Sequence, residues 1–353
     1  MSAVSTTQSP DPKLAARWLA RLDSGQTVRD EVLDAVRGGT AQTRDLRGIR
    51  AIGESLAGVD LSGFDLRDAD LSGADLTGAR LVQADLRGTV LHGTNLTDAE
   101  LLAADLSGAN LTEVQAPRCG FGQATLEGAT MFNATLDGST FHGANLSGID
   151  LRAASMPGVR MVEANLTGAM FEGAQLQNSD ITGCVMSDAV FDRVDLTGAQ
   201  VSGVRGYEDA SFIGARILGV DFCGAYLVRR FIMDQNYLHE FRGQNRMSAA
   251  VYWVWWATSD CGRSFTRWSL WTVLIMCLFG IAFQFVQMDY GDYQTPLSSF
   301  YYSVVTLTTL GYGDVLPASL PAQVLAMAEV VIGYVMLGGL LSIFANKMAR
   351  RAD

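Results

Sequence analysis

The sequence predicts a mixed fold, in which a coil of short β-segments precedes a small α-helical domain with two membrane-spanning helices and a re-entrant loop. Three observations carry this prediction: a five-residue repeat over most of the chain, two long uncharged apolar runs near its end, and a glycine-bracketed segment between them. Residues 51–230 hold 23 acidic residues against 11 arginines and no lysine, whereas residues 268–346 hold no basic residue. This contrast indicates a domain boundary between them.

The repeat has a period of five. From Leu56 to Val201, every fifth residue is Leu, Phe, Met, Ile or Val, with Ala116 the only interruption. A small residue, usually alanine, stands two positions earlier, and Asp or Asn commonly lies between the two. This period fits neither an α-helix nor a long strand. It fits a square coil of four units, with the large residue and the alanine inside, Asp/Asn and Gly at the corners, and coils about 4.8 Å apart.

These units, such as "ADLSGADLTGARL" at residues 69–81, resemble the pentapeptide-repeat family. The resemblance covers roughly residues 46–235 and implies a right-handed quadrilateral β-helix. The register slips after Val201, which predicts a loop at one corner around residues 202–211. Some family members mimic DNA with an acidic surface. Here the acidity belongs to the repeat itself, so we expect a scaffold and no nucleic-acid partner, and the β-helix's ligand or protein partner is left open.

The first 45 residues are expected to form a tail and short capping helices. Two apolar stripes at helical spacing indicate them: Leu14, Trp18 and Leu22, then Val28, Val32 and Val36. Covering the open edge of the first coil is the ordinary role of such helices. A contact with another subunit is the alternative.

Two apolar segments predict membrane spans. "WSLWTVLIMCLFGIAFQFVQM" at residues 268–288 has no charge and would span about 32 Å as a helix. The second, residues 321–346, contains one carboxylate, Glu329. Basic residues flank both spans on one side: Arg242, Arg246, Arg263, Arg267, Lys347, Arg350 and Arg351. We therefore expect the protein in the inner or plasma membrane, surrounded by its lipids, with both termini in the cytoplasm.

Residues 236–267 are expected to form a linker with an interfacial amphipathic helix. Its tryptophans, together with that of residue 268, stand beside arginines and suit the lipid headgroup level: Trp253, Trp255, Trp256 and Trp268. A plain apolar contact with a neighbouring subunit is the alternative.

The loop between the spans contains "SSFYYSVVTLTTLGYGD" at residues 298–314. Its first part suits a short helix. Gly311 and Gly313 then bracket Tyr312, and glycine reaches positive φ at little cost. Non-helical backbone at membrane depth is tolerated where it is protected or lines a wet path. Carbonyl groups of one chain cannot surround an ion, but those of four symmetric copies can.

This arrangement resembles the two-transmembrane potassium-channel family over about residues 268–348. The resemblance implies a pore domain at residues 268–353, with an outer helix at 268–288, a pore helix at 297–308, a filter at 309–313 and an inner helix at 321–348. By position, K⁺ would bind the carbonyls of four residues, and a fifth closes the filter's outer end: Thr309, Leu310, Gly311, Tyr312 and then Gly313. No cofactor other than these K⁺ ions is implied.

Further roles follow from the same resemblance. Filter support is expected from four residues: Thr308, Asp314, Tyr301 and Tyr302. Three glycines are candidate hinges of the inner helix: Gly333, Gly338 and Gly339. The candidate gate is the stretch from Leu340 to Phe344.

Three residues depart from this pattern or add to it. Leu310 replaces the usual valine or isoleucine and removes a β-branch from the filter. Val305 stands where some relatives carry an acid bonded to Asp314, so that brace is expected to be absent. Glu329 is the one ionisable group within a span. It is expected either to brace the pore helix, protonated or hydrogen-bonded, or to sense protons at the gate.

The sequence thus predicts a homotetrameric potassium channel whose cytoplasmic β-helix acts as a scaffold or gating regulator. Two alternatives stay open: a membrane-tethered binding protein with an acidic rod, and a nonselective cation channel. The five scattered cysteines and three histidines form no CxxC pair, so neither a disulfide framework nor a zinc site is expected. No catalytic constellation is evident, and we do not expect an enzyme.

Overall fold

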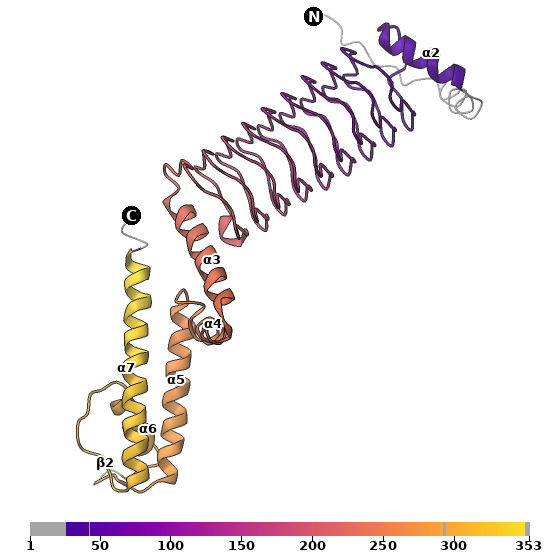
Figure 1. Cartoon of the computed structure of the whole chain (residues 1–353). Coiled ribbons are helices and arrows are strands. Elements are labelled where there is room, and N and C mark those ends of the chain that lie inside the picture. Colours follow the sequence, from indigo (N-terminus) through magenta and orange to yellow (C-terminus); the bar gives the residue numbers. More distant parts are fainter. Residues whose placement is uncertain (1–25, 42, 292–293, 350–353) are drawn as a thin grey trace, which may run out of the picture. The chain divides into compact units, whose positions relative to one another are not determined.

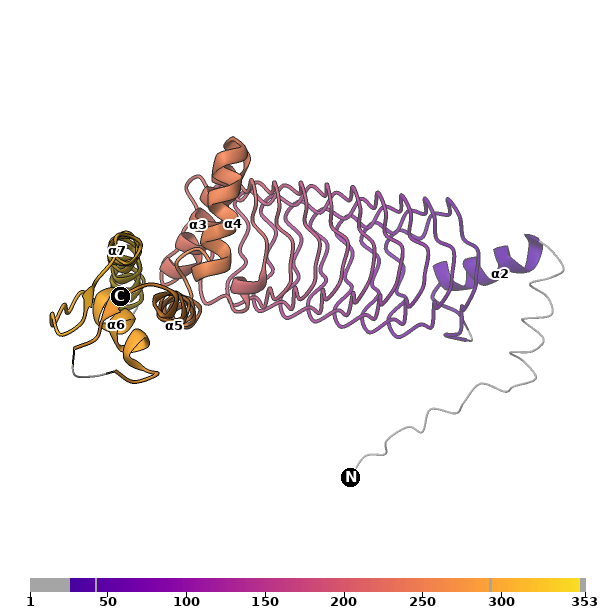
Figure 2. The same cartoon turned by 90° about the horizontal axis from the view of Figure 1, so that it is seen from below.

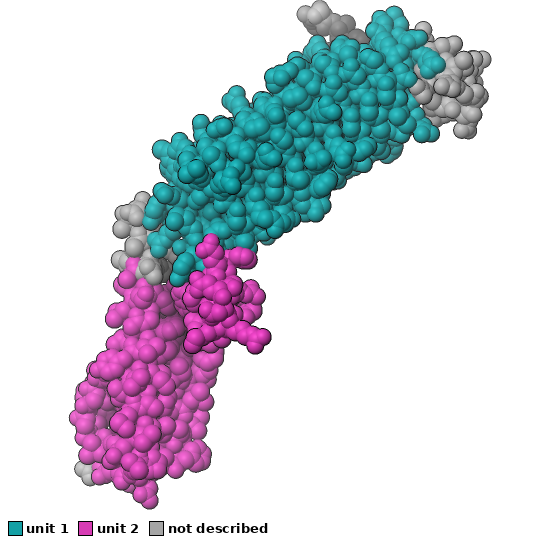
Figure 3. Space-filling model, in the orientation of Figure 1, with its two compact units in different colours: residues 1–237 teal, residues 238–353 magenta. Residues whose placement is uncertain are grey.

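The computed structural model of the chain describes residues 26–41, 43–291 and 294–349, and it divides into two compact units, residues 1–237 and 238–353 (Figure 3). Helices α2 (Gln26–Arg37), η1 (Tyr207–Asp209) and α3 (Tyr226–Gln244) accompany the coil. The remaining elements are α4 (Arg246–Ser259), α5 (Phe265–Ala282), η2 (Phe283–Phe285), β1 (Met288–Asp289), α6 (Ser298–Leu307), β2 (Leu316–Pro317) and α7 (Leu320–Ala349).

The five-residue repeat forms a quadrilateral β-helix, visible as stacked coils in Figures 1 and 2. Parallel bridges join residues 20 apart, from Asp45↔Asp65 to Val185↔Arg205, so each coil contains four repeat units. The large and the small residue of most units are buried, and phenylalanines stack within the core, as in the pair Phe121–Phe141 with ring centroids 4.7 Å apart. The predicted β-helix is confirmed.

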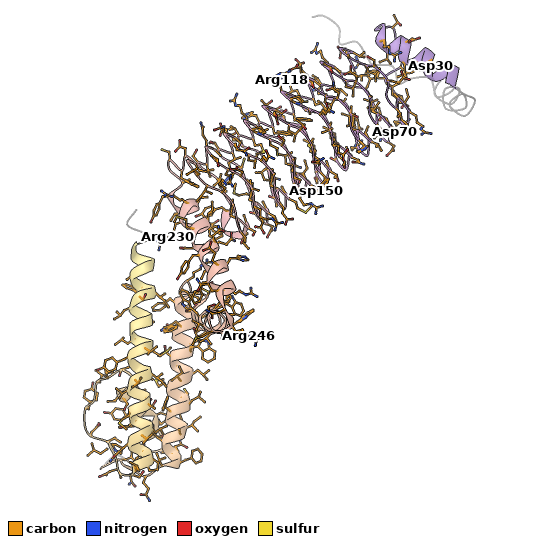
Figure 4. All side chains as sticks on the ribbon, in the orientation of Figure 1. Asp30, Asp70, Arg118, Asp150, Arg230 and Arg246 are labelled. Atoms are coloured by element: carbon orange, nitrogen blue, oxygen red, sulfur yellow. The ribbon has the colours of Figure 1, made fainter. Side chains whose placement is uncertain are left out.

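The corners differ from the expectation. In a typical unit, the carbonyl of Leu71 accepts a hydrogen bond from the amide of Ala74 at 3.0 Å, and Gly73 has a φ of 64°. The turn therefore lies at the Ser/Thr and Gly positions, because the turn needs a residue at positive φ. Asp70 lies at the bridge position between corners, on the outside of the coil (Figure 4), and its Oδ1 accepts from the amide of Ser72 at 3.2 Å. The Asp/Asn residues thus cap the turns rather than form them.

A ladder of charges runs along one face of the first coils. Arginines alternate there with aspartates: Asp45, Arg47, Asp65, Arg67, Asp85, Arg87 and Asp105. Each arginine lies 2.5–2.7 Å from the carboxylate of its own coil and 3.4–3.5 Å from that of the next. A side-chain hydrogen bond from Arg87 lowers the pKa of Asp85. Single exposed pairs contribute little, but this network links successive coils.

Helix α2 covers the first coil. Val32, Leu33 and Val36 are buried in the same core cluster as the coil interior. Arg37 extends from the end of α2, and its Nε donates to the carbonyl of Ser55 at 2.9 Å. The expected helix with Leu14, Trp18 and Leu22 lies outside the described residues, as does the side chain of Val28.

One extra residue enters the coil near its end. The bridge offset rises from 20 residues at Val185↔Arg205 to 21 at Val190↔Ser211. Gly206, with a φ of 70°, and the short helix η1 take up this residue at a corner. The loop expected at residues 202–211 is confirmed.

The β-helix ends earlier than expected, because α3 begins at Tyr226 and not after residue 235. Leu227 and Ile232, which continue the five-residue spacing, lie in this helix. The segment after Ala225 has no glycine before Gly243, so it lacks the residue that the corner turn requires, and its sequence favours a helix instead.

The start of α3 closes the last coil. Val228 and Ile232 pack into the coil core. Gln235 accepts from the amide of Phe212 at 2.6 Å and donates to the carbonyl of Ala210 at 3.1 Å. Asn236 accepts from the amide of Gly214 at 2.7 Å and donates to the carbonyl of Phe212 at 3.0 Å. These two side chains replace the backbone of the next coil, which would otherwise leave an open edge.

Helix α4 does not have the amphipathic character expected of the linker. Asn245 caps its start by accepting from the amide of Ser248 at 2.8 Å, and Asp260 ends it with a φ of 51°. Between these caps the helix exposes apolar residues on all sides: Met247, Val251, Trp253, Val254, Trp255 and Trp256. Arg242 lies over the rings of Tyr252 and Trp253, 5.5 and 5.2 Å from their centroids.

Two helical segments are long and apolar enough to cross a membrane, judged by length and composition. They are Phe265–Phe285, with 21 residues and a mean hydropathy of 1.8, and Leu320–Ala345, with 26 residues and a mean hydropathy of 2.1. The first does not continue as an α-helix to residue 288. It tightens into η2 after Ala282, where fully buried Phe283 packs edge-on against Tyr302 with ring centroids 4.9 Å apart.

Candidate functional site

Helix α6 brings the chain to the glycine-bracketed segment. The helix ends at Leu307, and Thr308 turns its Oγ1 back to donate to the carbonyl of Val304 at 2.5 Å. Thr309 then adopts a φ of 59°. A β-branched residue rarely adopts this left-handed conformation, which costs about 1–2 kcal/mol. Such strain is typical of functional segments.

Positive φ recurs at every second residue of the segment. Thr309, Gly311 and Gly313 have φ values of 59°, 54° and 76°. All five residues from 309 to 313 are exposed in the single chain. Among the described residues, no carbonyl from 309 to 312 accepts a hydrogen bond, so these oxygens are free to bind a ligand.

Asp314 follows this segment and is held by α6. The hydroxyl of Tyr301 donates to Oδ2 of Asp314 at 2.6 Å. Tyr302 packs instead on Phe283, as described above. Val305 is buried, and its carbonyl accepts from the amide of Leu310 at 2.9 Å. The segment is therefore anchored to α6 by its own first residues and by the aspartate that follows it.

Helices α6 and α7 run side by side in the same direction, because two contacts between them have the same offset of 26 residues. A Cβ added to Gly333 would lie 2.4 Å from the carbonyl oxygen of Leu307. One turn earlier in both helices, the hydroxyl of Ser303 is hydrogen-bonded to Oε1 of Glu329. Gly333 thus permits the backbones to approach closely at the point where α6 ends.

Glu329 is completely buried, as is Ser303. The Ser303 hydroxyl also lies 2.8 Å from the carbonyl oxygen of Met276 in α5. The second carboxyl oxygen of Glu329, Oε2, has no hydrogen-bond partner among the described residues. Three helices therefore meet at one buried polar group.

The inner helix α7 contains the three candidate hinge glycines but is continuous from Leu320 to Ala349. A Cβ on Gly339 would lie 2.2 Å from the ring of Trp268, whose Nε1 donates to the carbonyl of Met336 at 2.8 Å. Close packing therefore accounts for Gly333 and Gly339. Nothing lies within 4 Å of a Cβ on Gly338. Bending at these positions stays a prediction, and so does a gate at Leu340 and the exposed Phe344.

Several contributing residues carried no sequence signal. Ser303 is one serine among several in α6. Trp268 of α5 was expected at the lipid interface and not in contact with α7. Gly280 lies in α5, where an added Cβ would lie 2.5 Å from the ring of Phe300. All three act through contacts between helices, which spacing along one helix does not reveal.

The electrostatics around the segment favour a cation. Residues 268–346 contain no basic side chain. The carbonyl end of α6, which carries partial negative charge, leads directly into the segment. Asp289 and Asp314 are exposed at the other end, and Asp292 lies outside the described residues.

Family models match both parts of the chain. Residues 268–350 match the family described as ion channel, and residues 55–205 contain matches to pentapeptide repeats. The chain joins pentapeptide repeats to an ion-channel domain. The two resemblances, of the five-residue repeat to pentapeptide repeats and of the Thr-Leu-Gly-Tyr-Gly region to potassium channels, are confirmed.

The ion-channel domain is similar to parts of potassium channels. It is 31% identical over 80 residues to the human voltage-gated potassium channel regulatory subunit KCNG2, which is 22% of this chain and 17% of that protein. It is 30% identical over 97 residues to two-pore potassium channel 1 of Arabidopsis thaliana, 27% of each chain. Two pore potassium channel b of Oryza sativa subsp. japonica is 39% identical over 93 residues, 26% of each chain. The chain therefore spans only about a sixth to a quarter of the length of these relatives.

Solved structures similar to the coil are pentapeptide-repeat proteins. HetL from Nostoc sp. strain PCC 7120 is 26% identical, covering 53% of this chain and 92% of its own, with a TM-score of 0.28. QnrB1, a plasmid-mediated fluoroquinolone resistance protein, is 19% identical, covering 52% and 95%, with a TM-score of 0.34. The β-helix assignment here stands on the bridges and burial of the chain itself.

Proposed function

We propose that the protein is a tetrameric channel that conducts K⁺ passively across a membrane. The observation that carries this proposal is the segment 309–313, in which every second φ value is positive and whose four carbonyl groups have no hydrogen-bond partner in the described part of the chain. One chain offers too few oxygens to replace the hydration shell of an ion. Four copies around one axis offer rings of four oxygens, in the manner of potassium-selective filters.

The exposure of the filter in the single chain supports assembly. Leu310 is 57% and Tyr312 is 66% exposed. Exposed filter residues next to apolar helices require neighbours that cover them in a membrane. Purified protein in lipid nanodiscs should therefore have the mass of a tetramer, and a monomer would contradict the proposal.

Conduction is tested with purified protein in liposomes loaded with a thallium-sensitive dye. Thallium influx is expected, because Tl⁺ substitutes for K⁺ in such filters. Purified protein is essential because one relative is named a regulatory subunit, and a chain that conducts only with a second subunit would show no flux alone. Gly311→Ala, which places a side chain at a φ of 54°, should abolish flux without preventing assembly.

Selectivity is the second measurement. Leu310 lacks the β-branch that stiffens this position in relatives, which favours a nonselective cation channel as the second candidate. Reversal potentials in mixed K⁺ and Na⁺ distinguish the two. A reversal potential near the K⁺ equilibrium potential supports selectivity. A reversal potential near zero, with equal total cation on both sides, supports the alternative.

We further propose that both termini lie in the cytoplasm and that the β-helix regulates opening. The arginines before the first span and after the second support the orientation. A truncated protein with residues 238–353 keeps the second compact unit. An open probability equal to that of the full chain across ligands, pH and voltage would reject a regulatory role and leave a scaffold.

A further inference from the structure

The buried contact between Glu329, Ser303 and Met276 has too few hydrogen-bond protons for its acceptors if Glu329 is ionised. Oε1 of Glu329 and the carbonyl of Met276 both lie within hydrogen-bonding distance of the Ser303 hydroxyl. A carbonyl and a carboxylate only accept hydrogen bonds, and a serine hydroxyl has one proton to give. With Glu329 ionised, one of the two contacts would place two oxygens together without a hydrogen between them.

One additional proton resolves this arrangement. A protonated Glu329 donates from Oε1 to Oγ of Ser303, and Ser303 donates its own proton to the carbonyl of Met276. Oε1 of Glu329, Oγ of Ser303 and the carbonyl oxygen of Met276 then each have a suitable donor or acceptor role. The result is a directed series of hydrogen bonds from α7 through α6 to α5.

The surroundings would not stabilise a negative charge. Glu329 is 0% exposed, and its Oε2 has no partner among the described residues. No basic side chain occurs from residue 268 to residue 346. Two other titratable groups belong to the neighbouring helices. Tyr302 of α6 interacts electrostatically with Glu329, and Cys277 of α5 follows Met276 in the sequence. A buried unpaired carboxylate costs several kcal/mol, whereas the neutral acid avoids most of this cost.

The position of this contact connects it to the filter. Ser303 lies one helical turn before Leu307, where α6 ends and the filter begins. On α7, Glu329 lies one turn before Gly333, and Gly333 packs on the backbone of Leu307. A displacement of α6 relative to α7 at Glu329 therefore displaces the start of the filter as well.

We propose that Glu329 carries a proton in the folded protein and is a positioning residue, which holds the pore helix α6 between α5 and α7 through Ser303. Removing the proton removes the donor of the first hydrogen bond and places a charge where only water could stabilise it. The single Ser303 proton can then serve only one of its two acceptors, so the pore helix loses its hydrogen bond either to α7 or to α5. Conduction should therefore decline as the proton is lost at alkaline pH. This part of the proposal rests on the proposed channel function.

The protonation state has a direct test that does not depend on conduction. Infrared difference spectra of full-length protein at neutral pH should show the C=O stretch of a carboxylic acid, absent in Glu329→Gln. Ser303→Ala should keep the band but move it, because the acid loses its hydrogen-bond acceptor. Absence of the band in the wild-type protein at neutral pH would overturn the proposal.

The positioning role is tested by thallium flux as a function of pH, from about 6 to about 9, the range that buried carboxyl groups reach. Wild-type flux should fall about tenfold across this range, the effect of losing one buried hydrogen bond between neutral groups. Glu329→Gln, which keeps the shape and a donor but cannot ionise, should conduct without this decline. Tyr302→Phe is the matched control, because it should retain the decline.

The outcomes distinguish the positioning role of Glu329 from the proposed channel function. The same alkaline decline in Glu329→Gln as in the wild type would refute the positioning role. No flux in any variant at any pH would refute the proposed function, while the infrared band would still decide whether Glu329 holds a proton.

Discussion

A methyl group at residue 333 should destabilise the ion-channel domain, although alanine favours helices over glycine. An ideal Cβ at this position lies 2.4 Å from the carbonyl oxygen of Leu307 and 3.1 Å from its carbonyl carbon. The obstacle is the backbone of α6, which cannot rotate aside as a long side chain can. Helices α6 and α7 must therefore separate by about half an ångström or more, with a cost of about 1–3 kcal/mol for an overpacked contact.

The net effect depends on a gain of opposite sign. Alanine in place of glycine within a helix contributes up to about 1 kcal/mol. We therefore expect Gly333→Ala to lower the free energy of unfolding by up to about 2 kcal/mol. Gly338→Ala is the matched control in the same helix, because nothing lies within 4 Å of its added Cβ. It should be stabilising by about 0.5–1 kcal/mol.

Tryptophan fluorescence provides the assay, since five of the six tryptophans lie between residues 253 and 271. Denaturant unfolding of the protein in detergent should order the stabilities as Gly338→Ala, wild type, Gly333→Ala. A glycine that served only as a flexible point would give the opposite sign at 333, because alanine would stiffen and stabilise the helix. Equal stabilisation by both variants would refute the close approach of Gly333 to Leu307.

Three further predictions concern other contacts. Tyr301→Phe removes the hydroxyl that donates to the aspartate after the filter, so channel open times in bilayer recordings should shorten while assembly persists; unchanged open times would show that this bond does not support the filter. Gln235→Ala leaves the amide of Phe212 without its acceptor, so hydrogen exchange at that amide should accelerate about tenfold for each 1.4 kcal/mol lost, and an unchanged rate would contradict the capping role. The pKa of Asp85 is lowered in the folded protein by a hydrogen bond from Arg87, so its contribution to stability is complete above the unfolded value of about 3.9 and is lost as pH falls through the lower folded value. Circular dichroism melts from about pH 7 to about pH 2 should show this decline, and Arg87→Met should reduce it.

The repeat region was predictable because each unit repeats the same local rule. A large residue, a small residue and a turn every five positions leave one arrangement that buries the large and the small residue of successive units together. Glycine at the corners was confirmed, whereas Asp/Asn at the corners was wrong. Both residue types are typical of turns, and the pattern alone does not say which one bends the chain. The end of the coil was placed about ten residues late. Apolar spacing continues into α3 through Leu227 and Ile232, whereas the loss of corner glycines after Gly224 marks the actual end.

The candidate filter was found because few backbones can present several carbonyls to one side, and paired glycines mark such a backbone. The residues that hold it could not be found this way. The bond between Ser303 and Glu329 depends on how α6 and α7 align, which no periodicity within either helix records. Tyr301 was expected to support the filter by position, and its hydrogen bond to Asp314 supplies a physical means for it to do so.

The 20-residue spacing of the bridges sets a unit in which the length of the β-helix can change. Deleting 20 residues would remove one storey, shorten the stack by about 4.8 Å and leave each remaining face above its former neighbour. Deleting five would instead turn everything downstream by a quarter revolution and present a different side to the surroundings. The single added residue near Gly206 does neither, because a corner absorbs it. Whole storeys are therefore interchangeable parts, and variants of this chain with longer or shorter stacks should fold without further adjustment.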